Sequence, residues 1–148
     1  MATIKHYTLI EQSKKLLKLG LNPESADMWY SYYGNSKYNP TIAYKGQQWF
    51  LCQIRNSLHD DIPCWSLGAL LEVMPEQIIY SDFKPFPLGL FKGNKEEHSK
   101  YGHYWIQYFA TDSGGAHIQT NGHSPIEAAY SMVVWLLENG YIKKESNH

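Results

Sequence analysis

GHYWIQYFATDSGGAHIQTNGHSPIEAAYSMVVWLLENG, residues 102–140, is the stretch that decides the fold class of this chain. Its first part holds two strand-like runs, 102–111 and 116–121, in which aromatic and β-branched side chains are frequent. The residues between them, 112–115, read Asp-Ser-Gly-Gly, which is typical of a β-hairpin turn. Rings occur on both alternating faces of the first run, so we expect it to be a central strand.

A helix is predicted directly after this hairpin. Ser124 is a preferred N-cap residue, Pro125 suits the first helical position, and Glu127 can complete a capping box. Gly140 is a typical residue for the helix end, after which the chain can fold back on the last turn. Four apolar side chains recur at helical spacing on one face: Ile126, Tyr130, Val133 and Leu137.

Two further helices are expected upstream. Thr8 and Glu11 have the spacing of a capping box, which predicts that the first helix starts at Thr8. The segment IPCWSLGALLEVMP, residues 62–75, is bracketed by Pro63 and Pro75 and predicts a second helix. This second helix is apolar on most of its faces, so we expect it to be largely buried.

The remaining regular segments predict strands. Residues 41–55 indicate a hairpin or one interrupted strand, and 77–83 and 87–92 indicate two more strands. We therefore expect one domain over 1–148 with an α+β fold: a mainly antiparallel sheet packed with about three helices, with an α-β-α sandwich as an alternative arrangement. Residues 143–148 are expected to form a flexible tail.

The charge balance argues against some partners. The chain has 13 Lys and Arg against 14 Asp and Glu, a net charge of −1, and Arg55 is its only arginine. Duplex DNA is read largely through arginine and a positive field, so no duplex nucleic acid partner is expected. No apolar run approaches the ~20 residues that span a bilayer, and no secretory signal is recognised. We expect a cytoplasmic protein without a membrane partner.

Catalytic and metal-binding patterns are weak. The seven histidines are scattered without ligand spacing, so neither a metal site nor a cofactor is predicted. Cys64 lies between Pro63 and Trp65, an apolar setting typical of an inert thiol. One alternative stays open, a small hydrolase or phosphodiesterase that uses dispersed polar residues: His103, Asp112, His117 and His123.

The stretch DMWYSYYGNSKY, residues 27–38, is the densest in aromatic rings. Rings of this kind stack on nucleobases, whose faces are flat and apolar. The candidate ligand-binding residues are Trp29, Tyr30, Tyr32, Tyr33 and Lys37, together with Trp65 and Trp105. The alternative is structural: Trp29 and Tyr33 point into the core, while Tyr30 and Tyr32 face solvent or a partner subunit.

Three segments carry a family resemblance: EQSKKLLKLGLNPESADMWY (11–30), IPCWSLGALLEVMP (62–75) and HSPIEAAYSMVVWLLENGYI (123–142). Together they resemble small uncharacterised proteins of phages and prophages of gut bacteria. The second half of the chain is also similar in layout to phage α-β-α sandwich domains. The resemblance implies an accessory protein, made in the bacterial cytoplasm, that binds a host component and acts in counter-defence.

The function expected from residues and resemblance together is non-enzymatic binding. The ligand is expected to be a small nucleotide-like signal or a host protein, and the protein is expected to be a homo-oligomer. The two rivals are the hydrolase named above and an interaction module that dimerises through its tyrosine-rich segment.

Overall fold

The computed structural model describes residues 6–32, 49–52, 61–79, 85–94, 102–109 and 116–145. The helices of this part are α1 (Ile10–Lys18), α2 (Leu67–Val73) and α3 (Pro125–Glu138), with a short 3-10 turn at Pro23–Ser25. Three strands belong to a small sheet: β1 (Met28–Tyr32), β2 (Trp49–Cys52) and β3 (Ile62–Cys64). Four belong to a larger sheet: β4 (Gln77–Ile79), β5 (Pro85–Lys92), β6 (Tyr104–Phe109) and β7 (Ala116–Gly122).

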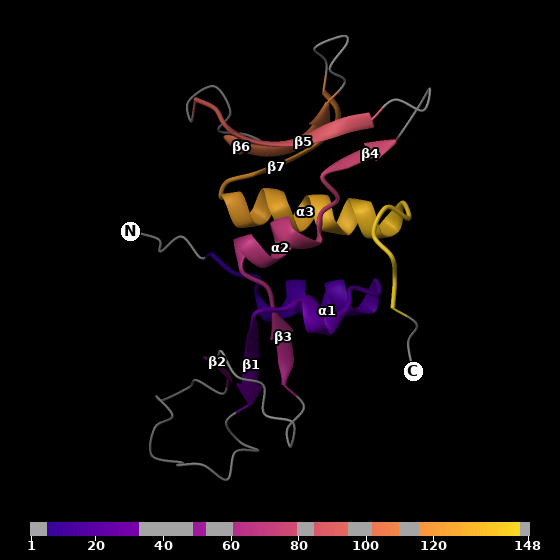
Figure 1. The fold of residues 1–148 in the computed structure, drawn as a ribbon. Coiled ribbons are helices and arrows are strands. Elements are labelled where there is room, and N and C mark those ends of the chain that lie inside the picture. Colours follow the sequence, from indigo (N-terminus) through magenta and orange to yellow (C-terminus); the bar gives the residue numbers. More distant parts are fainter. Residues whose placement is uncertain are drawn as a thin grey trace.

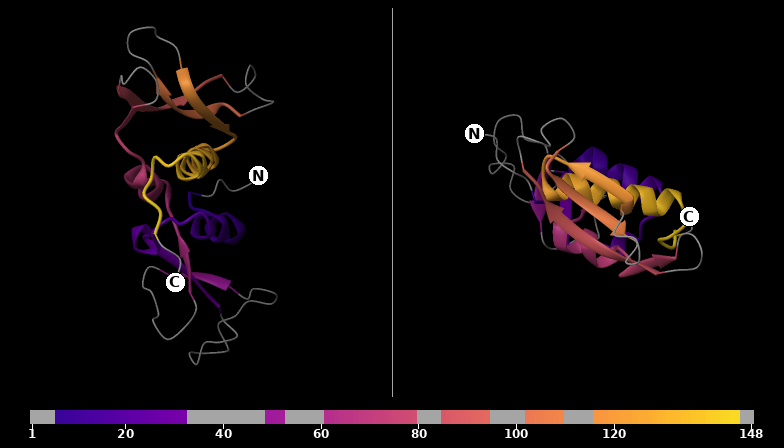
Figure 2. Two further views of the ribbon diagram at one scale, coloured as in Figure 1. Left: turned by 90° about the vertical axis from the view of Figure 1, so that its right-hand side faces the viewer. Right: turned by 90° about the horizontal axis from the view of Figure 1, so that it is seen from above.

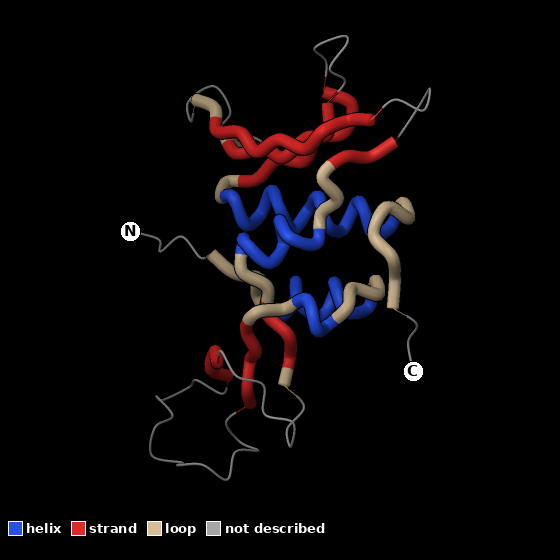
Figure 3. The backbone as a smooth tube through the Cα atoms, in the orientation of Figure 1, coloured by secondary structure: helices blue, strands red, loops and turns tan. Residues whose placement is uncertain are grey.

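The helices lie between the two sheets (Figures 1 and 3). The small sheet has the order β2-β1-β3 and the larger one β4-β5-β6-β7, and every pairing is antiparallel. The predicted α+β class, with antiparallel pairing and about three helices, is therefore confirmed. The described strands form two sheets, whereas one mainly antiparallel sheet was expected. The layer order is sheet, helices, sheet, which differs from the alternative α-β-α sandwich, where helices cover both faces of one sheet.

The larger sheet is built around β6, which pairs with β5 on one side and β7 on the other. The predicted antiparallel strand pair and the central place of its first strand are thus confirmed, whereas the predicted turn at 112–115 lies outside the described residues. Side chains alternate between two faces of the sheet. One face is buried against α3 through Ile106, Tyr108 and Ile118.

The last helix follows its predicted signals. Ser124 is the N-cap of α3 and its hydroxyl oxygen accepts a hydrogen bond from the Glu127 N–H. Gly140 has a φ of 80°, a left-handed conformation that glycine adopts without strain. The chain then folds back as predicted, because the Tyr141 ring stacks on Trp135 at 5.5 Å between ring centroids.

Glycine at position 122 allows β7 to approach α3 closely. A Cβ atom added to Gly122 would lie 2.6 Å from the backbone nitrogen of Ala128. The Thr120 hydroxyl donates to the Ala128 carbonyl oxygen at 2.8 Å in the same region. The end of β7 and the first turns of α3 are therefore held together backbone to backbone.

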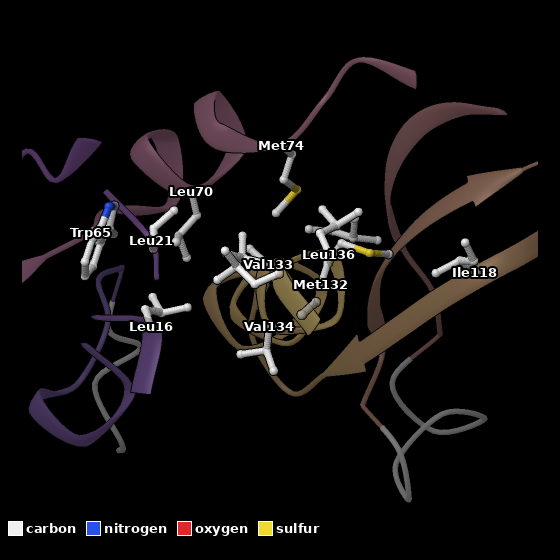
Figure 4. Close-up of a cluster of buried hydrophobic side chains, with 14 of the residues drawn as sticks. Leu16, Leu21, Trp65, Leu70, Met74, Ile118, Met132, Val133, Val134 and Leu136 are labelled. Atoms are coloured by element: carbon white, nitrogen blue, oxygen red, sulfur yellow. The ribbon is translucent and has the colours of Figure 1, made fainter. Parts of the chain in front are cut away.

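A single hydrophobic cluster connects all three helices with the larger sheet (Figure 4). Figure 4 shows Leu16 and Leu70 on one side of α3 and Ile118 on the other, with Met132 and Leu136 of α3 between them. Met132 and Leu136 have no exposed surface. The apolar side chains of α3 therefore pack in two directions, against the larger sheet and against α2.

The predicted helix over 62–75 is wrong in its first part. Ile62–Cys64 form β3, which pairs with β1, and the helix begins only at Leu67. Ser66 is the N-cap and its hydroxyl oxygen accepts from the Ala69 N–H at 3.1 Å. Pro63 tolerates the strand because β3 is an edge strand, where a missing N–H costs little.

The capping box expected at Thr8 and Glu11 is also wrong, by one residue. Leu9 is the N-cap of α1, and its N–H donates to the Gln12 side-chain oxygen at 2.8 Å. The Thr8 side chain is instead fully buried and binds other groups. A side chain that can cap a helix locally is thus used for a tertiary contact.

Further predictions fall partly outside the described residues, among them the strand expected over 77–83, of which Gln77–Ile79 are described as β4. Of the hairpin expected over 41–55, the structure describes Trp49–Cys52 as β2, paired with β1. Of the tail expected over 143–148, residues 143–145 are described, and the Glu145 N–H donates to the Gly20 carbonyl oxygen at 2.7 Å. The predicted tail thus includes residues that the structure attaches to the end of α1.

Candidate ligand-binding face

The face of the larger sheet that points away from α3 carries no covering element among the described residues (Figures 1 and 2). Seen from above, this outer face is turned to the viewer in Figure 2. The strand register places Phe91 opposite Trp105, and Gly89 opposite Gln107, on this face. The side chains at the alternate positions of these strands, such as Ile106 and Tyr108, point to the other face and are buried against α3.

Three aromatic rings gather on the outer face: Phe91, Trp105 and Phe109, called here the ring cluster. Phe91 and Trp105 are 6.1 Å apart between centroids and nearly parallel, at 19°. Phe91 and Phe109 meet edge to face, at 6.3 Å and 70°. Phe91 is 39% exposed, so the cluster presents aromatic surface to solvent.

Gly89 lies beneath the rings of Phe91 and Phe109. A Cβ atom at Gly89 would collide with the Phe91 ring and would lie 3.2 Å from Cε1 of Phe109. The Phe91 ring therefore lies over the bare backbone of its own strand. Glycine also weakens a strand because it offers no side chain to pack, and a neighbouring ring compensates for that.

Carboxamide side chains border the ring cluster. Gln107 lies opposite Gln119, and Trp105 lies opposite Asn121, on the same face. The Gln119 side-chain N–H donates to the Asn121 side-chain oxygen at 2.9 Å. Carboxamides offer both donors and acceptors, so this border can bind polar ring edges that present either kind of group.

The outer face is also free of formal charge within the four strands. Their only Lys, Arg, Asp or Glu is Lys92, which pairs with Tyr104 and shares the opposite face. The Lys92 ammonium lies 5.5 Å from the centroid of the Tyr104 ring, which places it over that ring. Ile79, 55% exposed, extends the apolar surface of the outer face at the β4 edge.

Two rings of the aromatic window of the sequence, Trp29 and Tyr30, are placed in the interior. Trp29 is 7% and Tyr30 9% exposed, on adjacent positions of the central strand β1. The Tyr30 hydroxyl donates to the Thr8 carbonyl oxygen at 2.7 Å, and burial raises the pKa of Tyr30 far above its usual value. Trp29 was expected in the core on the structural alternative, whereas Tyr30 was expected to face outward, and its burial corrects that expectation.

The other members of that window are only partly described. Tyr32 ends β1 and lies opposite Trp49 in the register. Tyr33 and Lys37 lie outside the described residues. Their predicted role in ligand binding stays a prediction.

Trp65 is enclosed and has no exposed surface. Its indole N–H donates to the Ser25 hydroxyl at 2.9 Å. Next to it, the Asp27 carboxylate accepts from both the backbone N–H and the hydroxyl of Ser66. Trp65 therefore joins the start of β1 to the start of α2, and in this structure it offers no surface to a ligand.

Of the predicted site residues, Trp105 alone is described on the outer face, where it is half-buried in the ring cluster. Its partners Phe91 and Phe109, and the bordering carboxamides, were not predicted as site residues. Their signal is in the sequence, because residues 87–92 and 104–109 alternate like two strands of one sheet. The alternation predicts two strands, but only the register between them shows which side chains lie on the same face.

Of the histidines of the hydrolase alternative, His103 and His123 are adjacent at one end of β6 and β7, because Tyr104 pairs with Gly122, whereas His117 lies toward the other end of β7. His117 and His123 are six residues apart along β7 and its end, which corresponds to about 20 Å in extended chain. His103 precedes β6 and lies beside the Tyr104 ring, at 4.3 Å between centroids. Asp112 is not among the described residues. Within the described ranges, no group of three or more His, Cys, Asp or Glu could hold a metal ion.

The cysteine thiols show no sign of activation. Burial raises the pKa of the Cys64 thiol, which donates to the Thr8 carbonyl oxygen at 3.4 Å. Burial also raises the pKa of the Cys52 thiol. A raised pKa means less thiolate at neutral pH, which is unfavourable for a nucleophile.

No helix in the part of the chain that the structure describes is both long and apolar enough to cross a membrane. No protein-family model, curated protein or solved structure significantly matches this chain.

Proposed function

We propose that this protein is a non-enzymatic binding protein that takes the planar ring of a nucleotide-like small molecule on the outer face of its larger sheet. The single observation that carries the proposal is the ring cluster of Phe91, Trp105 and Phe109 on a sheet face that no described element covers. Exposed ring surface such as that of Phe91 is otherwise unfavourable, because removing apolar surface from water lowers the free energy.

The chemistry of this face fits a heteroaromatic ring. Base–aromatic stacking contributes roughly 1–3 kcal/mol per base in single-strand complexes. The carboxamides of Gln107, Gln119 and Asn121 can bind the donors and acceptors at the edge of such a ring. Among the described side chains at the rings there is neither a base nor a nucleophile, and binding without turnover is the activity that we propose for this composition.

The resemblance to phage accessory proteins supplies a biological setting for the proposal. A binding protein made in the bacterial cytoplasm can sequester a nucleotide signal of the host and so act in counter-defence. A host protein is the other partner that the resemblance implies, and the experiment below distinguishes the two.

Binding is tested by isothermal titration calorimetry of the purified chain with adenosine, guanosine, ADP-ribose and cyclic dinucleotides. Maltose serves as a ring-shaped ligand without a π-system. We expect at least one of the nucleotide-class ligands to bind and maltose not to bind. The Phe91→Ala and Trp105→Ala variants should each weaken binding by about 5- to 100-fold, because each removes stacking surface.

Trp135→Ala is the matched control. Trp135 also belongs to a stacked, partly exposed pair, with Tyr141, but this pair lies at the end of α3 and not on the outer face. The affinity of the Trp135→Ala variant for the ligand should equal that of the unchanged protein. If none of the nucleotide-class ligands binds at millimolar concentration, or if Trp135→Ala weakens binding as much as Trp105→Ala, the proposal is wrong and a protein partner becomes the better hypothesis.

A further inference from the structure

β7 forms one edge of the larger sheet. It pairs with β6 on one side, and no strand of the described part pairs with its other side. An edge strand presents a row of backbone N–H and C=O groups to which another strand can bind. Natural proteins usually protect such edges with short strands, prolines or charged side chains.

Among the other described edge strands, β3 carries such protections, since it has three residues and contains Pro63. The edge strand β7 differs, since it runs for seven residues, AHIQTNG, without a proline or a Lys, Arg, Asp or Glu residue. Its pairing with β6 is irregular only at its start, where the register shifts between Ala116 and Ile118.

We propose that β7 pairs antiparallel with β7 of a second copy of this chain, around a two-fold axis at Gln119. With Gln119 at the axis, residues 118–120 of the two strands pair regularly, and the register shift at the start of β7 lies at the two outer ends of the paired segment. An interface of this kind is isologous, meaning that the same surface of each copy contacts the other, as in most homodimers.

The side chains in this register are compatible. Ile118 lies opposite Thr120 of the other copy on the helix-covered face, and such β-branched cross-strand pairs are favourable. On the outer face Gln119 lies opposite its own copy, where two carboxamides can hydrogen-bond each other. No two like charges are brought together, because β7 carries none of the formally charged side chains.

The pairing extends the outer face across both copies, so that the two ring clusters lie on the same side of one continuous sheet. A ligand with two planar rings could then contact both clusters. The pairing itself depends only on β7 and holds whatever the ligand is, so it is tested without any ligand.

The test is size-exclusion chromatography with light scattering over a dilution series. The unchanged protein should have twice the 17.1 kDa mass of the chain at micromolar concentration. Gln119→Lys and Gln119→Glu each place two like charges at the axis and should shift dissociation to at least tenfold higher concentration. An equimolar mixture of the two variants should recover the dimer, because the charges across the axis then attract.

Gln77→Lys is the matched control, since Gln77 is an exposed glutamine on the outer face at the opposite edge of the same sheet. It should leave the dimer intact. Circular dichroism checks that each variant is folded, and the second charged variant replaces the first if one does not fold. A monomeric unchanged protein, a dimer that both Gln119 variants leave intact, or a mixture that stays monomeric would overturn the pairing.

Discussion

Thr8 is the centre of a buried group of hydrogen bonds. Its hydroxyl lies 2.8 Å from the Ser13 hydroxyl and accepts a hydrogen bond from the backbone N–H of Trp65 at 3.1 Å. Its N–H donates to the Trp65 carbonyl oxygen, and its carbonyl oxygen accepts from the Tyr30 hydroxyl. One residue therefore joins α1, β1 and the segment before α2. Among the described residues, every buried side-chain nitrogen or oxygen has a partner, as buried polar groups require.

At the residue scale, the buried tyrosines lead to a prediction about the stability of the protein at alkaline pH. Tyr108 has no exposed surface, its hydroxyl donates to the Pro75 carbonyl oxygen at 2.6 Å, and burial raises its pKa well above the usual value of ~10. In the unfolded chain this phenol ionises near pH 10, whereas in the folded chain it stays protonated. Its contribution to stability is thus complete below about pH 10 and decreases above it, by up to ~1.4 kcal/mol per pH unit.

Tyr108→Phe should therefore reduce the alkaline loss of stability by up to ~1.4 kcal/mol per pH unit above pH 10. At pH 7 the same variant should be less stable by about 1 kcal/mol, because it loses a hydrogen bond. Urea unfolding between pH 7 and pH 11 measures both. Tyr30→Phe, the second buried tyrosine with a raised pKa, should change the alkaline slope in the same direction. Equal slopes in the variants and the unchanged protein would contradict the prediction.

At the scale of elements, local signals are sufficient where no distant group competes for them. The Ser124 and Pro125 signals predict the start of α3 correctly, since the Ser124 hydroxyl caps its own helix. Thr8 has an equally good local signal, but its hydroxyl binds Trp65 and Ser13, residues of other segments or later turns. Residues 62–64 belong to the proline-bracketed apolar run that predicts the second helix, yet in the structure they pair with β1 as a strand. Pairing with a distant segment cannot be read from local propensity.

The start of α2 depends on two connected hydrogen bonds, and this dependence leads to a prediction about the free energy of unfolding. The Ser66 hydroxyl accepts from the Ala69 N–H and also donates to the Asp27 carboxylate. Ser66→Ala removes both and should lower the free energy of unfolding by about 2 kcal/mol. Ser124→Ala at α3 removes only a cap bond of 3.3 Å and should cost about 1 kcal/mol or less.

Urea unfolding at neutral pH compares the two serine variants. In Asp27→Ala, the further change Ser66→Ala should cost less than it does alone, because their shared hydrogen bond is already lost. Equal losses for Ser66→Ala and Ser124→Ala would show that the Asp27 contact contributes nothing.

At the scale of the whole molecule, α3 holds the layers together. Its buried side chains belong to one cluster that includes Leu16 of α1, Leu70 of α2 and Ile118 of β7 (Figure 4). The small sheet is connected to this cluster through Trp65, which is buried in it. Within the part of the chain that the structure describes, the larger sheet is therefore covered on one face only, and the ring cluster lies on the other face.

Met132 tests whether this cluster unfolds as one unit. Met132→Ala leaves a cavity at a fully buried position and should lower the free energy of unfolding by about 2–5 kcal/mol. Far-UV circular dichroism and tryptophan fluorescence should show the same shifted midpoint, because both sheets depend on α3. Ser131→Ala, one residue earlier on a partly exposed position of α3, should shift the midpoint little. Two separate transitions in Met132→Ala would contradict a single cooperative core.

The sequence by itself determined the fold class, the strand character of β6 and β7, and the start and end of α3. These features depend on caps, turns and periodicities that act within a few residues. Only the tertiary structure decided which rings are buried and which are exposed. Trp65 and Trp105 look alike along the chain, but the first lies inside the core and the second on the outer face, because helices cover only one face of the larger sheet.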